Sequence, residues 1–101
     1  MIARHWTGIC KRESAADYIA HLEEDTFKTL GLIKGFLRAA ILKRDVAEGV
    51  EFLITTHWDS IDAIRAFAGV NFENAVVPEF VQKIMIRYDK TVRHYEIYTS
   101  V

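Results

Sequence analysis

The junction between residues 50–58 and residues 61–68 constrains the fold of this chain more than any other stretch. Residues 50–58 have the composition and alternation of a β-strand, and residues 61–68 carry apolar side chains at helical spacing. Between them stand Asp59 and Ser60, residue types that cap helix N-termini. Side chains alternate along a strand, so Trp58 and the preceding residue are predicted to point to opposite faces. The chain is therefore expected to pass directly from strand to helix, with Trp58 at the mouth of a pocket between them.

The N-terminal third predicts one strand and one helix. Residues 1–12 alternate without helical spacing, and Gly8 among them suggests a bulge or a close approach by another group. Ser14 is predicted to cap the following helix, and Gly31 to end it. The apolar stripe of this helix recurs near a 3.6-residue period: Ala15, Tyr18, Ile19, Leu22, Thr26 and Leu30.

The remainder of the chain continues the alternation of extended and helical runs. Residues 36–44 and 50–58 are predicted to form a β-hairpin across a polar turn. The helix after them is expected to end at Gly69, with one more helical turn over residues 71–76. Pro78 can start a short helix, and the tail is predicted to be extended over residues 84–88 and 91–98.

The order β-α-β-β-α-β is that of the α+β, ferredoxin-like arrangement. It predicts a single domain over residues 1–101, with a four-stranded antiparallel sheet whose first strand lies between the third and the fourth. The helices would cover one face of the sheet. The other face would be too apolar for water and too polar for a core, which predicts a homodimer packed sheet to sheet through residues such as Leu53, Thr55, His57, Tyr95 and Ile97.

Composition excludes several classes of function. Thirteen basic and fourteen acidic residues give a net charge of −1, which argues against a nucleic-acid-binding protein. The lone Cys10 cannot form an intrachain disulfide and excludes multi-cysteine metal sites. No apolar run approaches the roughly 18 residues of a membrane span, so neither a membrane nor nucleic acid is expected as a partner. We expect a cytoplasmic protein.

A resemblance to a known group rests on five segments: IARHWTG (residues 2–8), EFLI (51–54), WDS (58–60), AIRAFAG (63–69) and VRHYE (92–96). Together they cover nearly the whole chain and resemble the antibiotic biosynthesis monooxygenase-like families of the dimeric α+β barrel superfamily. The resemblance implies a ferredoxin-like domain that dimerises into a barrel. Because this superfamily hosts several chemistries, it indicates the fold more specifically than the function.

The best-known members of that group oxidise small aromatic molecules without metal or flavin. An acidic phenol loses a proton in a dry pocket, and its electron-rich anion reacts with oxygen directly. A haem-degrading branch uses an asparagine, a tryptophan and a haem-ligating histidine, and the matching positions here are Trp6, Phe67 and Val77. None of the three residues is present, so haem degradation is disfavoured, and neither a cofactor nor a metal is expected.

Arg4 and His94 are the predicted catalytic residues. A buried guanidinium needs a partner or an anionic ligand, so Arg4 would orient a phenolate or carboxylate; the alternative is that it pairs with Glu96 at the sheet edge. An imidazole is a suitable general base for a phenolic proton, which favours His94. Its structural alternative is a hydrogen bond to Glu96 or a bridge across the dimer.

Four aromatic residues are the predicted substrate-binding group: Trp6, Trp58, Tyr18 and Phe67. The two tryptophans would form the walls of a pocket between sheet and helices, with Tyr18 reaching it from the first helix. Large aromatic side chains in a small domain are also ordinary core residues. Both interpretations stay open on the sequence alone.

The other histidines and the cysteine have plainer interpretations. His5 and His57 are expected on the face opposite the tryptophans, where they would line the dimer interface rather than bind a metal. His21 is interpreted as part of a solvated, charged helix face, and Cys10 as a buried structural thiol.

Two functional hypotheses follow. The first is a cofactor-independent monooxygenase acting on a small aromatic or quinol-like substrate, with an enclosed pocket lined by Trp6 and His94. The second is a non-catalytic dimeric module that binds a small ligand or holds a complex together. A helix–sheet interface packed solid by Phe67, Trp58 and Ile64 would favour the second hypothesis.

Overall fold

Five strands form one antiparallel sheet in the computed structural model, which describes all residues 1–101. Their bounds are β1 Ile2–Cys10, β2 Phe36–Val46, β3 Gly49–Trp58, β4 Met85–Tyr88 and β5 Arg93–Glu96. The sheet order is β2-β3-β1-β4, and β5 also pairs with β1. The first strand therefore lies between the third and the C-terminal strands, and the α+β ferredoxin-like fold prediction is confirmed.

The predicted fourth strand is interrupted and forms two strands. Gly8 of β1 pairs with Tyr88, and His5 pairs with Arg93. Two residues of β1 thus lie opposite residues 89–92, so the edge strand bulges by two residues. The bulge is held to β1 because the Asp89 N–H donates to the Thr7 carbonyl at 2.9 Å. The sheet consequently has five strands rather than the predicted four.

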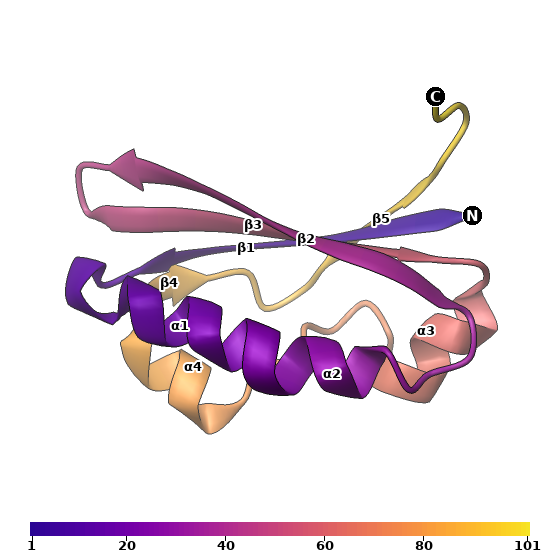
Figure 1. Cartoon of the computed structure of the whole chain (residues 1–101), viewed down its shortest axis with the longest axis horizontal. Coiled ribbons are helices and arrows are strands. Elements are labelled where there is room, and N and C mark those ends of the chain that lie inside the picture. Colours follow the sequence, from indigo (N-terminus) through magenta and orange to yellow (C-terminus); the bar gives the residue numbers. More distant parts are fainter.

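All helices cover one face of the sheet (Figure 1). Along the chain they are the 3-10 turn η1, the helix α1, the π-helical segment η2, and α2, α3 and α4: Arg12–Ser14, Ala15–His21, Leu22–Thr26, Phe27–Leu30, Ile61–Ala68 and Glu79–Ile84. None of them is long and apolar enough to cross a membrane.

Three local predictions about the helices are wrong. Ser14 makes no side-chain capping bond, because a 3-10 turn precedes α1 and leaves Ser14 with helical backbone angles. The first helix is not uniformly α-helical, since η2 interrupts it. Residues 71–76 are not helical: a turn at residues 72–73 is followed by an isolated bridge from Asn74 to Thr91 and then by irregular structure.

The junction from strand to helix is built as predicted. The Ala63 N–H donates to Ser60 Oγ at 3.1 Å, which caps α3, and Gly69 ends the helix. Gly35 packs against this junction with a φ of 98°, and a Cβ there would lie 2.6 Å from that of Ala63. Only glycine fits this positive φ and this close approach, so the loop before β2 is tied to the start of α3.

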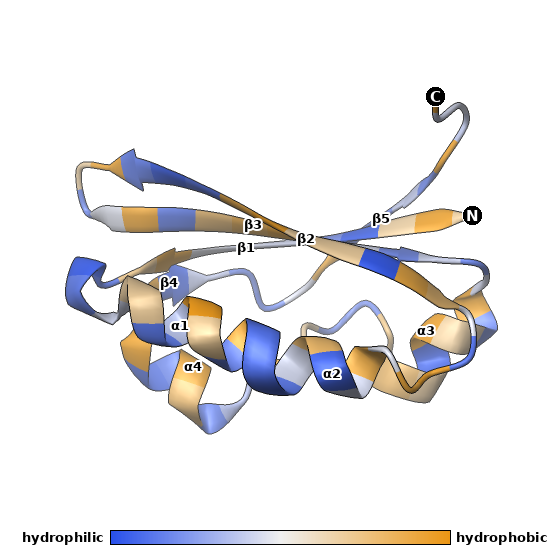
Figure 2. Cartoon of the chain, viewed as in Figure 1, coloured by the Kyte–Doolittle hydropathy of each residue, from blue (hydrophilic) through white to orange (hydrophobic).

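Alternation along the strands separates two faces of the sheet. In β3 the side chains of Val50, Phe52, Ile54, Thr56 and Trp58 are buried beneath the helices. Orange and blue bands alternate along α1 and α2 in Figure 2, as expected for helices with one buried side. Two core clusters result, one around Phe52 and one around Trp58.

The face of the sheet away from the helices carries half-exposed side chains of mixed polarity. Leu53, Thr55 and His57 of β3 lie there, and Tyr95 of β5 is 49% exposed. This is the face from which the sequence predicts dimerisation. The C-terminal residues after β5 extend beyond the sheet on the side away from the helices (Figure 1).

Candidate functional site

A cavity of about 80 Å³ lies between the sheet and the helices. The sheet contributes β1 and β3, the long N-terminal helix contributes α1, η2 and α2, and the remaining wall comes from α3 and the segment around α4. Sixteen residues line the cavity, and eleven of them are hydrophobic. The sixteen are Arg4, Trp6, Tyr18, His21, Leu22, Thr26, Phe27, Leu30, Ile54, Thr56, Phe67, Val76, Val77, Pro78, Val81 and Val92. The helix–sheet interface is therefore not packed solid.

Arg4 is the only arginine or lysine in this wall, and it is 5% exposed. It comes from the centre of the sheet, opposite Thr56 of β3 and His94 of β5. Its Nη1 donates to the Phe72 carbonyl, and its Nη2 donates to the Asn74 carbonyl at 3.1 Å. The guanidinium thus also fastens the turn between α3 and α4 to β1.

No carboxylate compensates the charge of Arg4. None lies within 4 Å of its guanidinium, and Glu96, the partner that the sequence suggests, makes no ion pair. Burial lowers the pKa of Arg4 to about 10. The Phe67 ring lies 5.7 Å from the guanidinium carbon and gives weak cation–π stabilisation. A buried cation with only neutral partners makes this end of the cavity suited to an anion.

The structure places His94 beside Arg4 and not in the cavity wall. Its Nε2 lies 3.0 Å from Nη1 of Arg4. A guanidinium can only donate, so Nε2 must be the acceptor and the ring proton sits on Nδ1. Burial, then the charge of Arg4, lowers the pKa of His94, while Glu73 opposes them. The imidazole is neutral, and its one lone pair accepts the hydrogen bond from Arg4. His94 is therefore better placed to position Arg4 than to act as the predicted base.

Three of the four predicted substrate-binding aromatics line the cavity: Trp6, Tyr18 and Phe67. The Trp6 indole N–H donates to the Asp89 carbonyl at 2.8 Å. Its ring covers Gly8, where an added Cβ would lie 2.6 Å from the ring edge, so the predicted close approach at Gly8 is confirmed. Tyr18 meets the Trp6 ring at 6.3 Å, and burial raises its pKa.

Trp58 is fully buried and does not reach the cavity. Its indole N–H donates to Thr56 Oγ1 at 2.8 Å, its face stacks on Phe67, and Phe36 contacts it edge-on at 5.3 Å. The prediction that Trp58 stands at a pocket mouth is wrong, because α3 and Phe36 enclose it completely. Trp58 supports the cavity wall through Phe67.

His21 and Thr26 are cavity residues that the sequence interpretation missed. The π-helical segment η2 begins directly after His21 and ends at Thr26. Residues five apart on an α-helix lie about 140° apart around the axis, whereas the wider π turn brings them to the same side. Thr26 Oγ1 lies 3.3 Å from Nε2 of His21, and the His21 side chain is only 16% exposed. The interpretation of His21 as solvated is wrong.

A signal for this arrangement exists in the sequence. The residues Tyr18, Leu22, Thr26 and Leu30 are spaced by four, not by 3.6. Over twelve residues an α-helix would spread such a stripe over about 120°, a wide apolar face, and a local widening of the helix narrows that spread. A π turn provides that widening, and such turns are frequent at functional sites.

His5 and His57 lie on the opposite face of the sheet, as predicted. His57 Nδ1 accepts a hydrogen bond from Arg38 at 3.2 Å, and the His5 ring lies 5.3 Å from that of Tyr95. Burial lowers the pKa of each; nearby charge, Arg93 at His5 and Arg38 at His57, lowers it further. No group of three or more histidine, cysteine or acidic side chains is arranged to hold a metal.

Comparison with solved structures places the fold. The chain aligns over its whole length with a candidate antibiotic biosynthesis monooxygenase from Deinococcus radiodurans, at 19% identity, 96% of that chain and a TM-score of 0.67. The same kind of protein from Bacillus cereus gives 16% identity, 94% of that chain and a TM-score of 0.62. The haem degrader MhuD from Mycobacterium tuberculosis, with two haems bound in its active site, also aligns over all of this chain. It gives 17% identity, 99% of that chain and a TM-score of 0.60.

No protein-family model matches the sequence, and no curated protein sequence matches it. At identities below 20% the structural likeness shows the fold and not the activity. The chain has the antibiotic biosynthesis monooxygenase-like fold that its sequence resembles.

Haem does not fit the cavity of this chain. A cavity of roughly 150 Å³ is enough for benzene, and the 80 Å³ here is too small for a porphyrin with four rings. The single histidine in the wall is His21, whose two nitrogens face Thr26 at 3.3 Å and Asp25 at 3.9 Å. Each ring nitrogen of His21 therefore already has a polar neighbour on the same helix.

Proposed function

We propose that this protein is a cofactor-independent monooxygenase that oxidises a small phenol or quinol bound in the cavity between sheet and helices. The observation that carries the proposal is Arg4, a buried guanidinium without a carboxylate partner at the edge of an apolar cavity. Such a site binds an aromatic ring and favours its anionic form. The likeness to proteins named as monooxygenases supports the reaction class.

The chemistry needs few groups from the protein. Loss of a proton makes the ring electron-rich, and a cation close to the ring anion stabilises it in a site with little water. Oxygen then oxidises the ring from phenol to quinone: one oxygen atom enters the ring carbon, and the other leaves as water with two hydrogens from the substrate. No external reductant enters this balance. Arg4 holds an anionic group of the substrate and places its positive charge in the same cavity as the ring, with Trp6, Tyr18 and Phe67 as apolar walls.

The cavity is smaller than a single aromatic ring, which favours a small substrate. It has about half of the roughly 150 Å³ that accommodates benzene, so binding requires a wall to open. Val76, Val77 and Pro78 form the wall that lacks regular structure, between the bridge at Asn74 and the start of α4. We expect this segment to move when a ligand enters.

Oxygen consumption by metal-free protein tests the proposal. Purified protein treated with a chelator and free of haem absorbance is given single-ring phenols and hydroquinones, with and without a carboxylate. We expect consumption of one oxygen molecule per quinone formed, and transfer of one labelled atom from ¹⁸O₂ to the product. Heat-denatured protein corrects for spontaneous oxidation.

The two functional hypotheses give different results in this experiment. A ligand that binds without oxygen consumption would support the non-catalytic binding module. The absence of both binding and turnover across the panel would contradict a small-molecule site in this cavity.

We also propose a homodimer through the sheet face opposite the helices. Leu42 and Tyr95 are about half exposed on that face, and Leu53 lies between them on the central strand β3. Exposed apolar side chains on one sheet face, here set among polar ones, support an interaction site on that face.

Sedimentation velocity at micromolar concentration is expected to give twice the mass of one chain. Leu53→Glu should give a monomer, because it places a charge at the centre of the interface. Leu32→Glu, on an exposed loop residue, is the matched control and should remain dimeric. A wild-type monomer at this concentration would contradict the proposal.

A further inference from the structure

The π turn brings together two polar side chains that the reaction described above does not use. His21 and Thr26 both line the cavity, on the helix side, whereas Arg4 lines it from the sheet side. Thr26 Oγ1 and Nε2 of His21 are 3.3 Å apart, and Asp25 Oδ2 lies 3.9 Å from the other ring nitrogen, Nδ1. The Phe80 ring covers the imidazole at 5.3 Å.

We propose that Thr26 and His21 form a proton relay opposite Arg4, and that the substrate is a phenol carrying an anionic group on the far side of its ring. This inference rests on the proposed function, because it names the proton acceptor and the substrate class of the same site.

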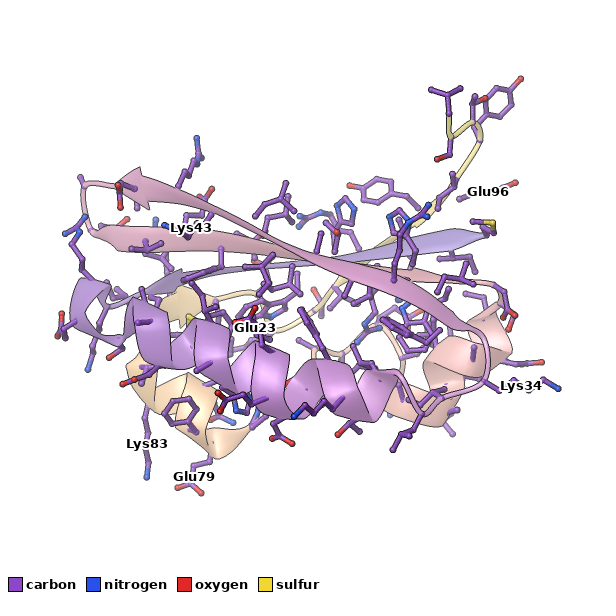
Figure 3. All side chains as sticks on the ribbon, in the orientation of Figure 1. Glu23, Lys34, Lys43, Glu79, Lys83 and Glu96 are labelled. Atoms are coloured by element: carbon purple, nitrogen blue, oxygen red, sulfur yellow. The ribbon has the colours of Figure 1, made fainter.

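The relay uses one tautomer of His21. With the ring proton on Nδ1, the nitrogen nearest Asp25, the lone pair of Nε2 can accept a hydrogen bond from the Thr26 hydroxyl. From the neighbouring helix α4, Glu79 and Lys83 pair with each other at 3.4 Å and project outward from the helix surface (Figure 3). Across the cavity the facing charge is Arg4. Asp25 is therefore the one carboxylate that lies within 4 Å of the His21 imidazole.

The relay conserves protons and charge. The phenol O–H bond breaks and its proton joins Thr26 Oγ1, while the hydroxyl proton of Thr26 moves to Nε2 of His21. The products are a phenolate and an imidazolium facing Asp25, and Thr26 is unchanged. The partial exposure of His21 allows its new proton to pass to water afterwards.

The position of the two polar groups indicates the substrate class. Arg4 offers donors to an anion from β1, and the relay accepts a proton from the helix side. A single ring with a carboxylate at one end and a hydroxyl at the other, as in a 4-hydroxybenzoate, engages both. A planar fork of guanidinium donors matches a carboxylate.

The probe 4-hydroxy-3-nitrobenzoate tests the relay without turnover, because its phenolate absorbs visible light and its phenol does not. Binding is measured by calorimetry, and the ionised fraction of the bound probe by absorbance over a pH series. His21→Gln and Thr26→Val should still bind the probe, because Arg4 holds its carboxylate, with an affinity within about tenfold of wild type for the loss of one hydrogen bond. At a pH one to two units below the pKa of the probe bound to wild type, the ionised fraction of the probe bound to these variants should be about tenfold smaller. That difference corresponds to a rise of one unit in the pKa of the bound probe.

Matched variants separate the relay from effects on folding. Thr26→Ser keeps the hydroxyl and should behave as wild type. Thr29→Val removes a hydroxyl from an exposed position on α2 and should also leave ionisation unchanged. Circular dichroism confirms that each variant is folded, and His21→Asn replaces His21→Gln if the latter is not.

The outcomes distinguish this inference from the proposed function. Equal ionisation of bound probe in wild type, His21→Gln and Thr26→Val would overturn the relay while leaving anion binding by Arg4 intact. A similar loss in Thr29→Val would also overturn it. No binding to wild type at millimolar probe would overturn both the relay and the proposed function.

Discussion

Arg4→Met is expected to weaken binding of a carboxylated phenol by about 10- to 100-fold while leaving the protein folded. Hydrogen bonds to charged groups contribute about 1.5–3 kcal/mol each, and 1.4 kcal/mol corresponds to a factor of ten in affinity. Methionine keeps the long apolar part of the side chain. It removes the guanidinium, and Arg4 is the only arginine or lysine in the cavity wall. Calorimetry with 4-hydroxy-3-nitrobenzoate measures the change.

Two opposing effects set the stability of Arg4→Met. Removal of a buried, unpaired cation stabilises the folded state, since replacing buried charge by apolar side chains is often neutral or favourable. The carbonyls of Phe72 and Asn74 and the Nε2 atom of His94 lose a donor, but all three residues are partly exposed, so water can replace it. We expect the free energy of unfolding to change by no more than about 1 kcal/mol, measured by urea denaturation.

Two further variants make this result specific. Arg44→Met removes an exposed arginine on the hairpin end of β2 and should leave the affinity unchanged. Arg4→Lys keeps the charge but has no planar fork, so it should restore part of the affinity only. If Arg4→Met binds the probe as tightly as wild type, the anion site is wrong.

The fold could be predicted from the sequence because its signals are local and repeated. The alternation that buries Val50, Phe52 and Ile54, the cap at Ser60 and the stop at Gly69 each act within a few residues. They require no knowledge of distant contacts. The split of the last strand could not be predicted in the same way, because it depends on the bonding of Asp89 to residues of β1 more than eighty positions away.

The site is harder to predict, for a physical reason. Alternation correctly places Arg4 under the helices, but it cannot say whether a neighbour on that face borders empty space. His94 shares that face and lies behind the guanidinium instead of in the cavity wall. On a uniform α-helix His21 and Thr26 would lie on different sides of the axis. The π turn brings them to the same side, where they meet at the cavity.

The two tryptophans show the same difference between face and position. The sequence predicts both as pocket walls, and both lie on the helix side of the sheet. Trp6 borders the cavity, whereas Trp58 is enclosed by Phe36, Phe67 and α3. The sequence does not distinguish them, but substitution should.

Trp58→Ala is expected to destabilise the protein more than any of the other substitutions. Truncation of a buried aromatic costs about 3–5 kcal/mol, and the whole free energy of unfolding of such a domain is about 5–15 kcal/mol. The change removes a side chain with no exposed surface and leaves Thr56 Oγ1 without its donor. Thermal unfolding should show a midpoint lower by about 4–8 °C for each kcal/mol lost.

Phenylalanine substitutions then separate the two roles. Trp58→Phe keeps most of the buried volume, so it should lower stability by about 1–2 kcal/mol through the lost hydrogen bond and a small cavity, and probe affinity should stay within about threefold of wild type. Trp6→Phe shortens a cavity wall and removes the bond to the Asp89 carbonyl, so it should change affinity more than Trp58→Phe does. A larger loss of affinity in Trp58→Phe than in Trp6→Phe would show that Trp58 contacts the ligand. A residue that supports the wall only through Phe67 should pass on only part of a packing change to the ligand.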